Sequence, residues 1–133
     1  MKTAFDLDGV FIPDCDEIPE LGGLVDFYRL TMYMRPIFTP EGEYAIITAR
    51  PAEYRSITHT WIHKYLSPSP IRLFHECVEE TPGAYKARIL NENSDIQIYV
   101  ESDEFIVKYL KQHVNTGCEI IHFDEYLANK FTN

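Results

Sequence analysis

The stretch Thr3-Ala4-Phe5-Asp6-Leu7-Asp8-Gly9-Val10 carries the features from which the fold is inferred. Its apolar run, Thr3–Leu7, has the length and composition of a buried strand. Side chains of an extended chain alternate between faces, so Asp6 and Asp8 are expected on the same side as the strand leaves the sheet. Gly9 lets the backbone turn tightly and approach a ligand. The stretch predicts a strand that ends in an acidic site; the alternative is an acidic turn after an edge strand.

Four further runs of about five residues are rich in Ile, Val, Phe or Tyr and bounded by turn-forming or charged residues, as strands are. With the first run, the expected strands are Thr3–Leu7, Tyr44–Thr48, Arg72–His75, Gln97–Glu101 and Glu119–Phe123. Between them, apolar side chains recur at the spacings of one helix face. The stripes are Leu21, Leu24, Val25, Tyr28 and Met32; Tyr54, Ile57, Trp61 and Tyr65; and Ile106, Tyr109 and Leu110. Pro51 and Pro82 mark expected helix starts, because a first-turn proline loses no hydrogen bond.

This alternation of strands and helices predicts an α/β fold. Right-handed crossovers produce a mostly parallel sheet covered on both faces, a three-layer Rossmann-like domain. The 133 residues suit one domain, 1–133, and no repeat or linker divides them. In such sheets ligands bind beyond the carboxyl ends of the strands, where the strand order reverses. Reactive residues at strand ends are therefore the candidates for a site.

Composition narrows the classes of function. The chain is 45% apolar, and its 12 basic and 21 acidic residues give a net charge of −9. Such a charge disfavours an extended nucleic-acid surface or an anionic membrane, although a local basic pocket can still hold a phosphate. No apolar run approaches the roughly 20 residues of a membrane helix, and the first residues lack the apolar stretch of a signal peptide. The three cysteines are widely spaced, and a cytoplasmic protein without membrane contact is expected.

The second expected strand ends in residues suited to binding a phosphate. Thr48 stands at the junction between this strand and the helix expected from Pro51. A hydroxyl there, with the free backbone N–H groups that follow at Ala49, would form an anion cradle at the positive end of a helix. The alternative is that Thr48 only caps the helix. The sequence leaves open whether Arg50 reaches a substrate or lies in solvent.

A lysine and a second acidic cluster complete the pattern. Lys86 lies in or near the first turn of the helix expected from Pro82, where the helix dipole disfavours a cation. That position makes sense if Lys86 balances Asp6 and a phosphoryl oxygen; the alternative is a solvated surface lysine. Glu101 and Asp103 follow another apolar strand, and carboxylate oxygens are ligands that Mg²⁺ prefers. The alternative for Asp103 is a cap on the next helix.

With an acid pair, a threonine, a lysine and an acid in this order, the chain resembles the haloacid dehalogenase-like (HAD) superfamily of phosphohydrolases, of the small capless type. Asp6-Leu7-Asp8-Gly9-Val10 looks like the first motif of that superfamily, Ile46-Ile47-Thr48 like the second, Lys86 like the third and Val100-Glu101-Ser102-Asp103 like the fourth. The resemblance implies a Mg²⁺-dependent phosphatase that hydrolyses a phosphate monoester through an aspartyl-phosphate. Many members of the superfamily insert a cap domain, but the intervals between the motifs are short here, so no cap, or a small flap built from Phe11–Pro19, is expected.

The resemblance further implies a role for each residue. Asp6 would attack phosphorus, and Asp8 would act as general acid and then as general base. The phosphate-binding residues would be Thr48, Ala49, Lys86 and Gly9. The metal ligands would be Asp6, the backbone carbonyl of Asp8 and a fourth-motif acid, Glu101 or Asp103. The fourth motif departs from the family pattern, because Glu101 stands where aspartate is usual.

Two alternatives to a phosphatase remain open at this point. One is a catalytically weak or inactive binding or regulatory domain of the same superfamily, and the other is a receiver-like phospho-acceptor. The expected partner is a phosphorylated small molecule, a nucleotide or a macromolecular phosphate. The apolar segment Thr31–Pro36 suggests a contact between two copies in a homodimer. His75 and His122, at the ends of apolar strands, are expected to pack or cap.

Overall fold

A five-stranded parallel sheet forms the centre of the computed structural model, which describes residues 2–14 and 24–131. The strand order is β3-β2-β1-β4-β5, and every neighbouring pair is parallel. The strands are β1 (Lys2–Phe5), β2 (Tyr44–Ile47), β3 (Arg72–Phe74), β4 (Ile96–Glu101) and β5 (Glu119–His122). All five expected strands are confirmed, and the α/β fold class with them.

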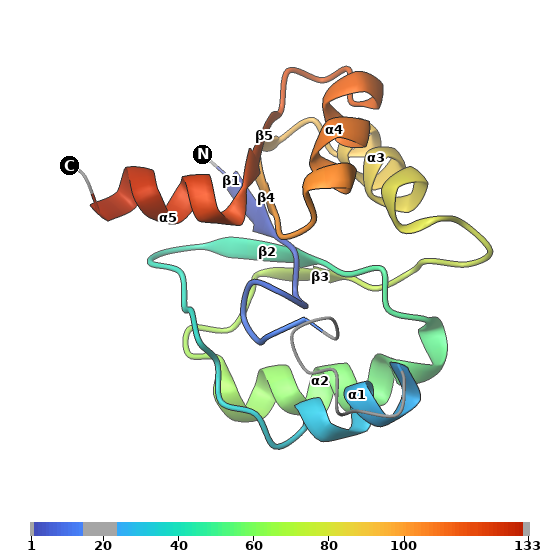
Figure 1. Cartoon of the computed structure of the whole chain (residues 1–133), viewed down its shortest axis with the longest axis vertical. Coiled ribbons are helices and arrows are strands. Elements are labelled where there is room, and N and C mark those ends of the chain that lie inside the picture. The colour runs from blue at the N-terminus through green and yellow to red at the C-terminus, as the bar shows by residue number, and fades with distance from the viewer. Residues whose placement is uncertain (1, 15–23, 132–133) are drawn as a thin grey trace.

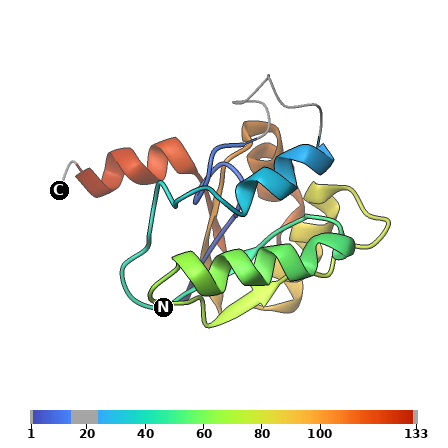
Figure 2. The same ribbon diagram turned by 90° about the horizontal axis from the view of Figure 1, so that it is seen from below.

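Helices lie on both faces of this sheet (Figure 1). The helices are α1 (Leu24–Thr31), the 3₁₀ helix η2 (Ala52–Tyr54), α2 (Arg55–Tyr65), α3 (Pro82–Glu92), α4 (Glu104–His113) and α5 (Phe123–Phe131). Helices α1 and α2 lie on one side and contact each other, and α3 and α4 lie on the opposite side (Figures 1 and 2). The three-layer arrangement expected from the sequence is therefore present. Within residues 2–14 and 24–131 there is no separate cap domain.

The helix starts follow local chemistry. Pro82 is the first residue of α3, and the hydroxyl of Thr81 accepts a hydrogen bond from the Ala84 N–H at 3.3 Å, which caps the helix. Pro51 precedes the 3₁₀ turn rather than an α-helix, and α2 begins only at Arg55. The expected helix after Pro51 therefore starts later and through a tighter turn.

Some boundaries differ from the expected ones. Strand β1 ends at Phe5, because the carbonyl of Leu7 accepts hydrogen bonds from the N–H groups of Val10 and Phe11 and turns the chain away. Phe123, expected to end β5, is instead the first residue of α5, a helix that the stripes did not indicate. Met32 lies beyond the end of α1, and Leu21 lies outside the described residues.

The sheet separates two apolar cores, because neighbouring side chains of a strand point to opposite faces. Ala4 packs on the face of α3 and α4, whereas Phe5 packs on the opposite face, against residues from α2 and α5. The first core contains Ile47, Tyr85, Leu90, Tyr99 and Leu110; the second contains Phe11, Tyr44, Trp61, Val100 and Phe123. Strand β1 contributes side chains to both cores, and their burial stabilises its place in the middle of the sheet.

Two further expectations concern surfaces. No helix in the described part of the chain combines the length and apolar character needed to cross a bilayer. In the segment expected to contact a second copy, Tyr33 is 75% exposed but Thr31 is fully buried, and its hydroxyl donates to the carbonyl of Tyr28 at 2.6 Å. Thr31 therefore belongs to the interior of the fold rather than to a contact surface.

Candidate functional site

The candidate site lies where three neighbouring strands end. Strand β1 has β2 on one side and β4 on the other, so the strand order reverses at β1, the place where ligands bind in open α/β sheets. A hollow of about 130 Å³ opens there. It is lined by Asp6, Asp8, Asp14, Tyr28, Thr48, Ala49, Arg50, Pro82, Lys86, Glu101, Ser102, Asp103 and Ile106. All but one of the expected site residues line this hollow, and the exception is Gly9.

Asp6 is held by three hydrogen bonds. Its Oδ1 accepts hydrogen bonds from the Leu7 N–H at 2.9 Å and from Lys86 Nζ at 3.1 Å. Its Oδ2 accepts a hydrogen bond from the hydroxyl of Ser102 at 2.7 Å. These contacts bring β1, α3 and the end of β4 to a single side chain and fix its orientation.

Lys86 is a buried cation, not a surface lysine. Only 3% of the residue is exposed, and Nζ lies 2.7 Å from Glu101 Oε1 as well as 3.1 Å from Asp6 Oδ1. Burial by itself would lower the pKa of Lys86, but the charges of Asp6 and Glu101 and their hydrogen bonds raise it above its ordinary value. Lys86 is therefore held as an ammonium ion between two carboxylates.

Glu101 is held on all sides by donors. Its Oε1 also accepts from the Tyr99 hydroxyl at 2.8 Å, and its Oε2 accepts from the Asp103 N–H at 3.1 Å. Burial, together with the charge of Asp6, raises the pKa of Glu101 to about 8, although Lys86 opposes this shift. One ammonium between two buried carboxylates leaves an excess of negative charge, and this excess favours a proton or a further cation.

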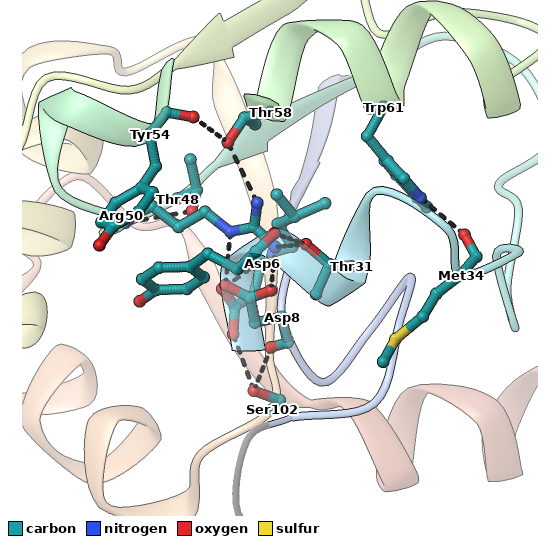
Figure 3. Close-up of polar contacts among 12 residues, drawn as sticks. Asp6, Asp8, Thr31, Met34, Thr48, Arg50, Tyr54, Thr58, Trp61 and Ser102 are labelled. Atoms are coloured by element: carbon teal, nitrogen blue, oxygen red, sulfur yellow. Dashed lines mark hydrogen bonds and ion pairs between the residues drawn. The ribbon is translucent and has the colours of Figure 1, made fainter. Parts of the chain in front are cut away.

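Asp8 is paired with a different cation from the one that binds Asp6. Arg50 donates from Nε to Asp8 Oδ2 at 2.9 Å and from Nη2 to Asp8 Oδ1 at 2.6 Å (Figure 3). Arg50 is 2% exposed and is further held by the hydroxyls of Thr58 and Thr31, at 3.1 and 3.3 Å. The Tyr28 ring lies 4.8 Å from its guanidinium carbon. Arg50 therefore lies neither in solvent nor free in the hollow.

The far end of this cluster reaches β3. His75 is buried, and its Nε2 lies 3.4 Å from the hydroxyl of Thr58, which also binds Arg50. No hydrogen bond to His75 Nδ1 is present within the described structure. Burial lowers the pKa of His75 to about 4, so the imidazole is neutral at pH 7. The expected packing role of His75 fits this environment.

Thr48 lines the hollow but does not begin a helix. Its hydroxyl accepts a hydrogen bond from the Arg50 N–H at 3.2 Å, and residues 48–51 separate β2 from the first helical turn. The Arg50 N–H is thus engaged by Thr48, while Thr48 and Ala49 both face the hollow. The expected cradle at a helix start is replaced by a non-helical turn at the end of β2.

Asp103 serves as a cap. Its Oδ1 accepts from the N–H groups of Phe105 and Ile106 at 2.8 and 3.3 Å, at the first turn of α4. This contact fits the capping alternative, and Asp103 lines the hollow as well. In the described ranges, no three His, Cys, Asp or Glu side chains are grouped as a metal site. The oxygen donors that do converge include a backbone carbonyl and a hydroxyl.

Ser102 belongs to the candidate site, although the sequence did not single it out. Its Oγ lies 2.7 Å from Asp6 Oδ2 and 3.0 Å from the carbonyl oxygen of Asp8 (Figure 3). Gly9 makes room for it: its φ is +88°, and a Cβ on Gly9 would lie 2.6 Å from Ser102 Cβ. Gly9 itself lines an adjoining hollow and not the one at the end of β1, and it contributes to the site by leaving space for Ser102. In the sequence, Ser102 stands between Glu101 and Asp103, and a serine between two acids gives no signal of its own.

Comparison of the chain with models of protein families, with curated proteins and with solved structures gives no match. The function is therefore argued from the chemistry of the site.

Proposed function

We propose that this chain is a Mg²⁺-dependent phosphatase that hydrolyses a phosphate monoester through an aspartyl-phosphate on Asp6. The observation that carries the proposal is the contact of the buried ammonium of Lys86 with Asp6, two residues 80 positions apart in the sequence. A buried lysine beside a carboxylate at the end of a central strand gives both a nucleophile and a fixed positive charge for phosphoryl oxygens.

The proposed reaction has two steps. An oxygen of Asp6 attacks phosphorus, the bond from phosphorus to the leaving oxygen breaks, and Asp8 donates a proton to that oxygen. Asp8 then takes a proton from a water molecule that attacks the same phosphorus, which releases phosphate and restores Asp6. The ester and one water are thereby converted to an alcohol and phosphate. Lys86, with Thr48 and Ala49, holds the phosphoryl oxygens.

The donors at the end of β1 fit a hard cation, because Mg²⁺ prefers oxygen ligands and keeps waters and phosphate oxygens in its shell. Asp6 and the backbone carbonyl of Asp8 would hold it. When bound, Mg²⁺ supplies positive charge that offsets the repulsion between Asp6 and the phosphoryl group. The excess negative charge around Lys86 supports the presence of such a cation.

The size of the hollow bears on the substrate. Sites that enclose a drug-sized ligand have volumes of about 300–1,000 Å³. The hollow lined by the described residues has about 130 Å³, which suits a phosphoryl group with its cation. The leaving group would extend beyond this hollow. A phosphorylated small molecule, a nucleotide or a macromolecular phosphate are the classes to test.

The test is turnover of an aryl phosphate, and of a panel of phosphometabolites, nucleotides and phosphopeptides, with and without Mg²⁺. The native chain is expected to release phosphate only with Mg²⁺, and Asp6→Asn is expected to fall to the uncatalysed rate. Asp95→Asn is the matched control, because Asp95 is an exposed acid paired with Lys2 on the surface. Equal, negligible rates for the native chain and Asp6→Asn on the whole panel would contradict the proposal.

A binding or regulatory domain is the second candidate, and one observation favours it. Both oxygens of Asp8 are engaged by Arg50, so the proposed proton donor is not free in this arrangement. A domain of this kind would bind a phosphate analogue such as beryllofluoride with Mg²⁺ but would not turn over any ester. Binding without turnover across the panel would favour this candidate, and a long-lived phosphoryl group on Asp6 would favour the receiver-like alternative.

A further inference from the structure

We infer that Ser102, in place of Glu101, supplies the fourth-motif oxygen to the divalent cation, and that Glu101 instead holds Lys86. This inference rests on the cation of the proposed function. It concerns which side chains of this chain bind that cation.

The oxygens around Ser102 outnumber the protons that can join them. The hydroxyl lies within hydrogen-bonding distance of two acceptors, Asp6 Oδ2 at 2.7 Å and the Asp8 carbonyl oxygen at 3.0 Å. A serine hydroxyl has one hydrogen and can donate fully to only one of them. Three oxygens from β1, the turn after it and the end of β4 therefore meet around a single proton. A divalent cation would satisfy all three.

Both carboxylate oxygens of Glu101 already accept hydrogen bonds from protein donors. Lys86 and Tyr99 donate to Oε1, and the Asp103 N–H donates to Oε2. Glu101 is 0% exposed, so water cannot replace any donor that it loses. Binding a metal would require Glu101 to give up these bonds and leave the buried Lys86 with one carboxylate fewer. Its side chain is held as the counter-ion of Lys86.

The backbone at Gly9 lets Ser102 approach the Asp8 carbonyl closely. Gly9 has a positive φ of +88°, and the space that its Cβ would take is filled by Ser102 Cβ and Oγ. The close approach of the two backbones places the Ser102 hydroxyl beside the Asp8 carbonyl. The position of the Ser102 hydroxyl beside the Asp8 carbonyl is therefore set by the backbone and does not depend on a flexible surface side chain.

With Asp6, the Asp8 carbonyl and Ser102 as ligands, only one of the three groups that contact the cation is charged. Cation affinity rises with the number of charged ligands, and Mg²⁺ sites of low ligand count are completed by phosphate oxygens. We therefore expect weak binding of the cation alone and stronger binding when inorganic phosphate is present, with the same coupling in both directions.

The test measures Mn²⁺ binding by electron paramagnetic resonance and calorimetry, with and without inorganic phosphate, so that it does not depend on turnover. Ser102→Ala is expected to weaken Mn²⁺ binding about tenfold or more, the range seen when a group that supports a metal is lost. Ser102→Asp is expected to tighten it, because a charged ligand is added. Glu101→Gln is expected to leave Mn²⁺ affinity within about threefold, although Lys86 loses a charged partner.

A change of ligand chemistry makes the test independent of folding defects. Ser102→Cys is expected to shift the preference from Mn²⁺ towards Cd²⁺, because thiolates select soft metals. A serine that only positions Asp6 would not produce this shift. The native chain is the control for Cd²⁺ binding by its own cysteines, and each variant is first checked for native unfolding behaviour without metal.

Two results would overturn the inference. One is a loss of Mn²⁺ binding in Glu101→Gln with unchanged binding in Ser102→Ala and no Cd²⁺ preference in Ser102→Cys. The other is a native chain that binds no Mn²⁺ even with phosphate, which would remove the cation of the proposed function as well. If Mn²⁺ binding follows Ser102 as expected but no ester is turned over, the inference stands and the phosphatase proposal fails.

Discussion

Arg50 holds both carboxylate oxygens of Asp8, from Nε at 2.9 Å and from Nη2 at 2.6 Å. This bidentate contact fixes the carboxylate of Asp8 in one plane. A single contact from a lysine ammonium cannot fix that plane. For Asp8 to pass a proton to a leaving group, one of its oxygens must turn away from Arg50 or share its lone pairs with the substrate. Arg50 therefore controls where Asp8 points.

Arg50→Lys is expected to keep the positive charge but lose the planar contact. Turnover of the aryl phosphate is expected to fall at least tenfold in kcat, with a smaller change in KM, because Asp8 is no longer oriented. Steady-state kinetics at saturating Mg²⁺ measure this split. Arg35→Lys, at an exposed position, is the control and is expected to match the native chain. A rise in KM alone, with kcat unchanged, would assign Arg50 to substrate binding instead.

Lys86→Met is expected to lower the free energy of unfolding by about 3–5 kcal/mol, because it leaves Asp6 and Glu101 buried without their shared cation. Urea unfolding can be followed by the fluorescence of Trp61, the single tryptophan, which is buried in the native state. The double variant Lys86→Met/Glu101→Gln is expected to recover part of this loss, since one buried charge is removed. Lys111→Met on the exposed face of α4 is the control, and equal stabilities of Lys86→Met and Lys111→Met would contradict this account.

Gly9→Ala is expected to be more destabilising than Gly117→Ala, although both glycines have positive φ values, +88° and +82°. The backbone penalty is shared and amounts to about 1–2 kcal/mol for a residue with a Cβ. Only at Gly9 does the new Cβ meet another group, Ser102, at 2.6 Å, whereas nothing lies within 4 Å at Gly117. Urea unfolding of the two variants measures the difference. Equal losses in the two variants would mean that Ser102 moves aside freely.

The stability of the chain is expected to depend on pH through His75. Burial lowers the pKa of His75 to about 4 in the folded state, whereas an unfolded histidine has a pKa of about 6.5. Between these values the unfolded chain binds a proton that the folded chain does not, so the free energy of unfolding falls as pH is lowered through this window. The slope is about 1.4 kcal/mol per pH unit.

His75→Leu is expected to remove this slope. From pH 7 to pH 4.5, the free energy of unfolding of the native chain is therefore expected to fall relative to that of the variant. Urea unfolding at a series of pH values measures it. His59→Leu is the matched control, because His59 is exposed on α2 nearby. Parallel pH profiles for the native chain and His75→Leu would show that His75 is protonated without penalty.

Much of this arrangement could be predicted from the sequence, because it depends on residue order. Apolar runs fix the strands, parallel strands bring their carboxyl ends to one edge, and Asp6, Thr48 and Glu101 all stand at such ends. Lys86 follows from its unfavourable position near a helix start. The alternation of strands and helices was enough to predict a central sheet with a layer of helices on each face.

The partner of Asp8 could not be predicted. The balance of Lys86 with Asp6 was expected and is present, whereas the sequence left open whether Arg50 reaches the site or lies in solvent. Only side-chain reach and burial decide that Arg50 binds Asp8. Ser102 was missed because a serine among acids carries no signal of its own. Helix α5 was missed because it follows β5 without a usual cap; the His122 ring accepts from the Asp124 N–H at 3.2 Å and takes that place.

The position of β1 between β2 and β4 has a consequence for biosynthesis. Lys2 and Asp95, which pair beside these strands, are 93 residues apart in the sequence. A growing polypeptide that has made β1 and β2 still lacks β4, Lys86 and Ser102, so Asp6 stays solvated until the chain has been translated through Ser102. A ribosome-bound chain stalled before β4 therefore cannot assemble the hydrogen bonds around Asp6, and these form only after β4 and Ser102 have left the exit tunnel.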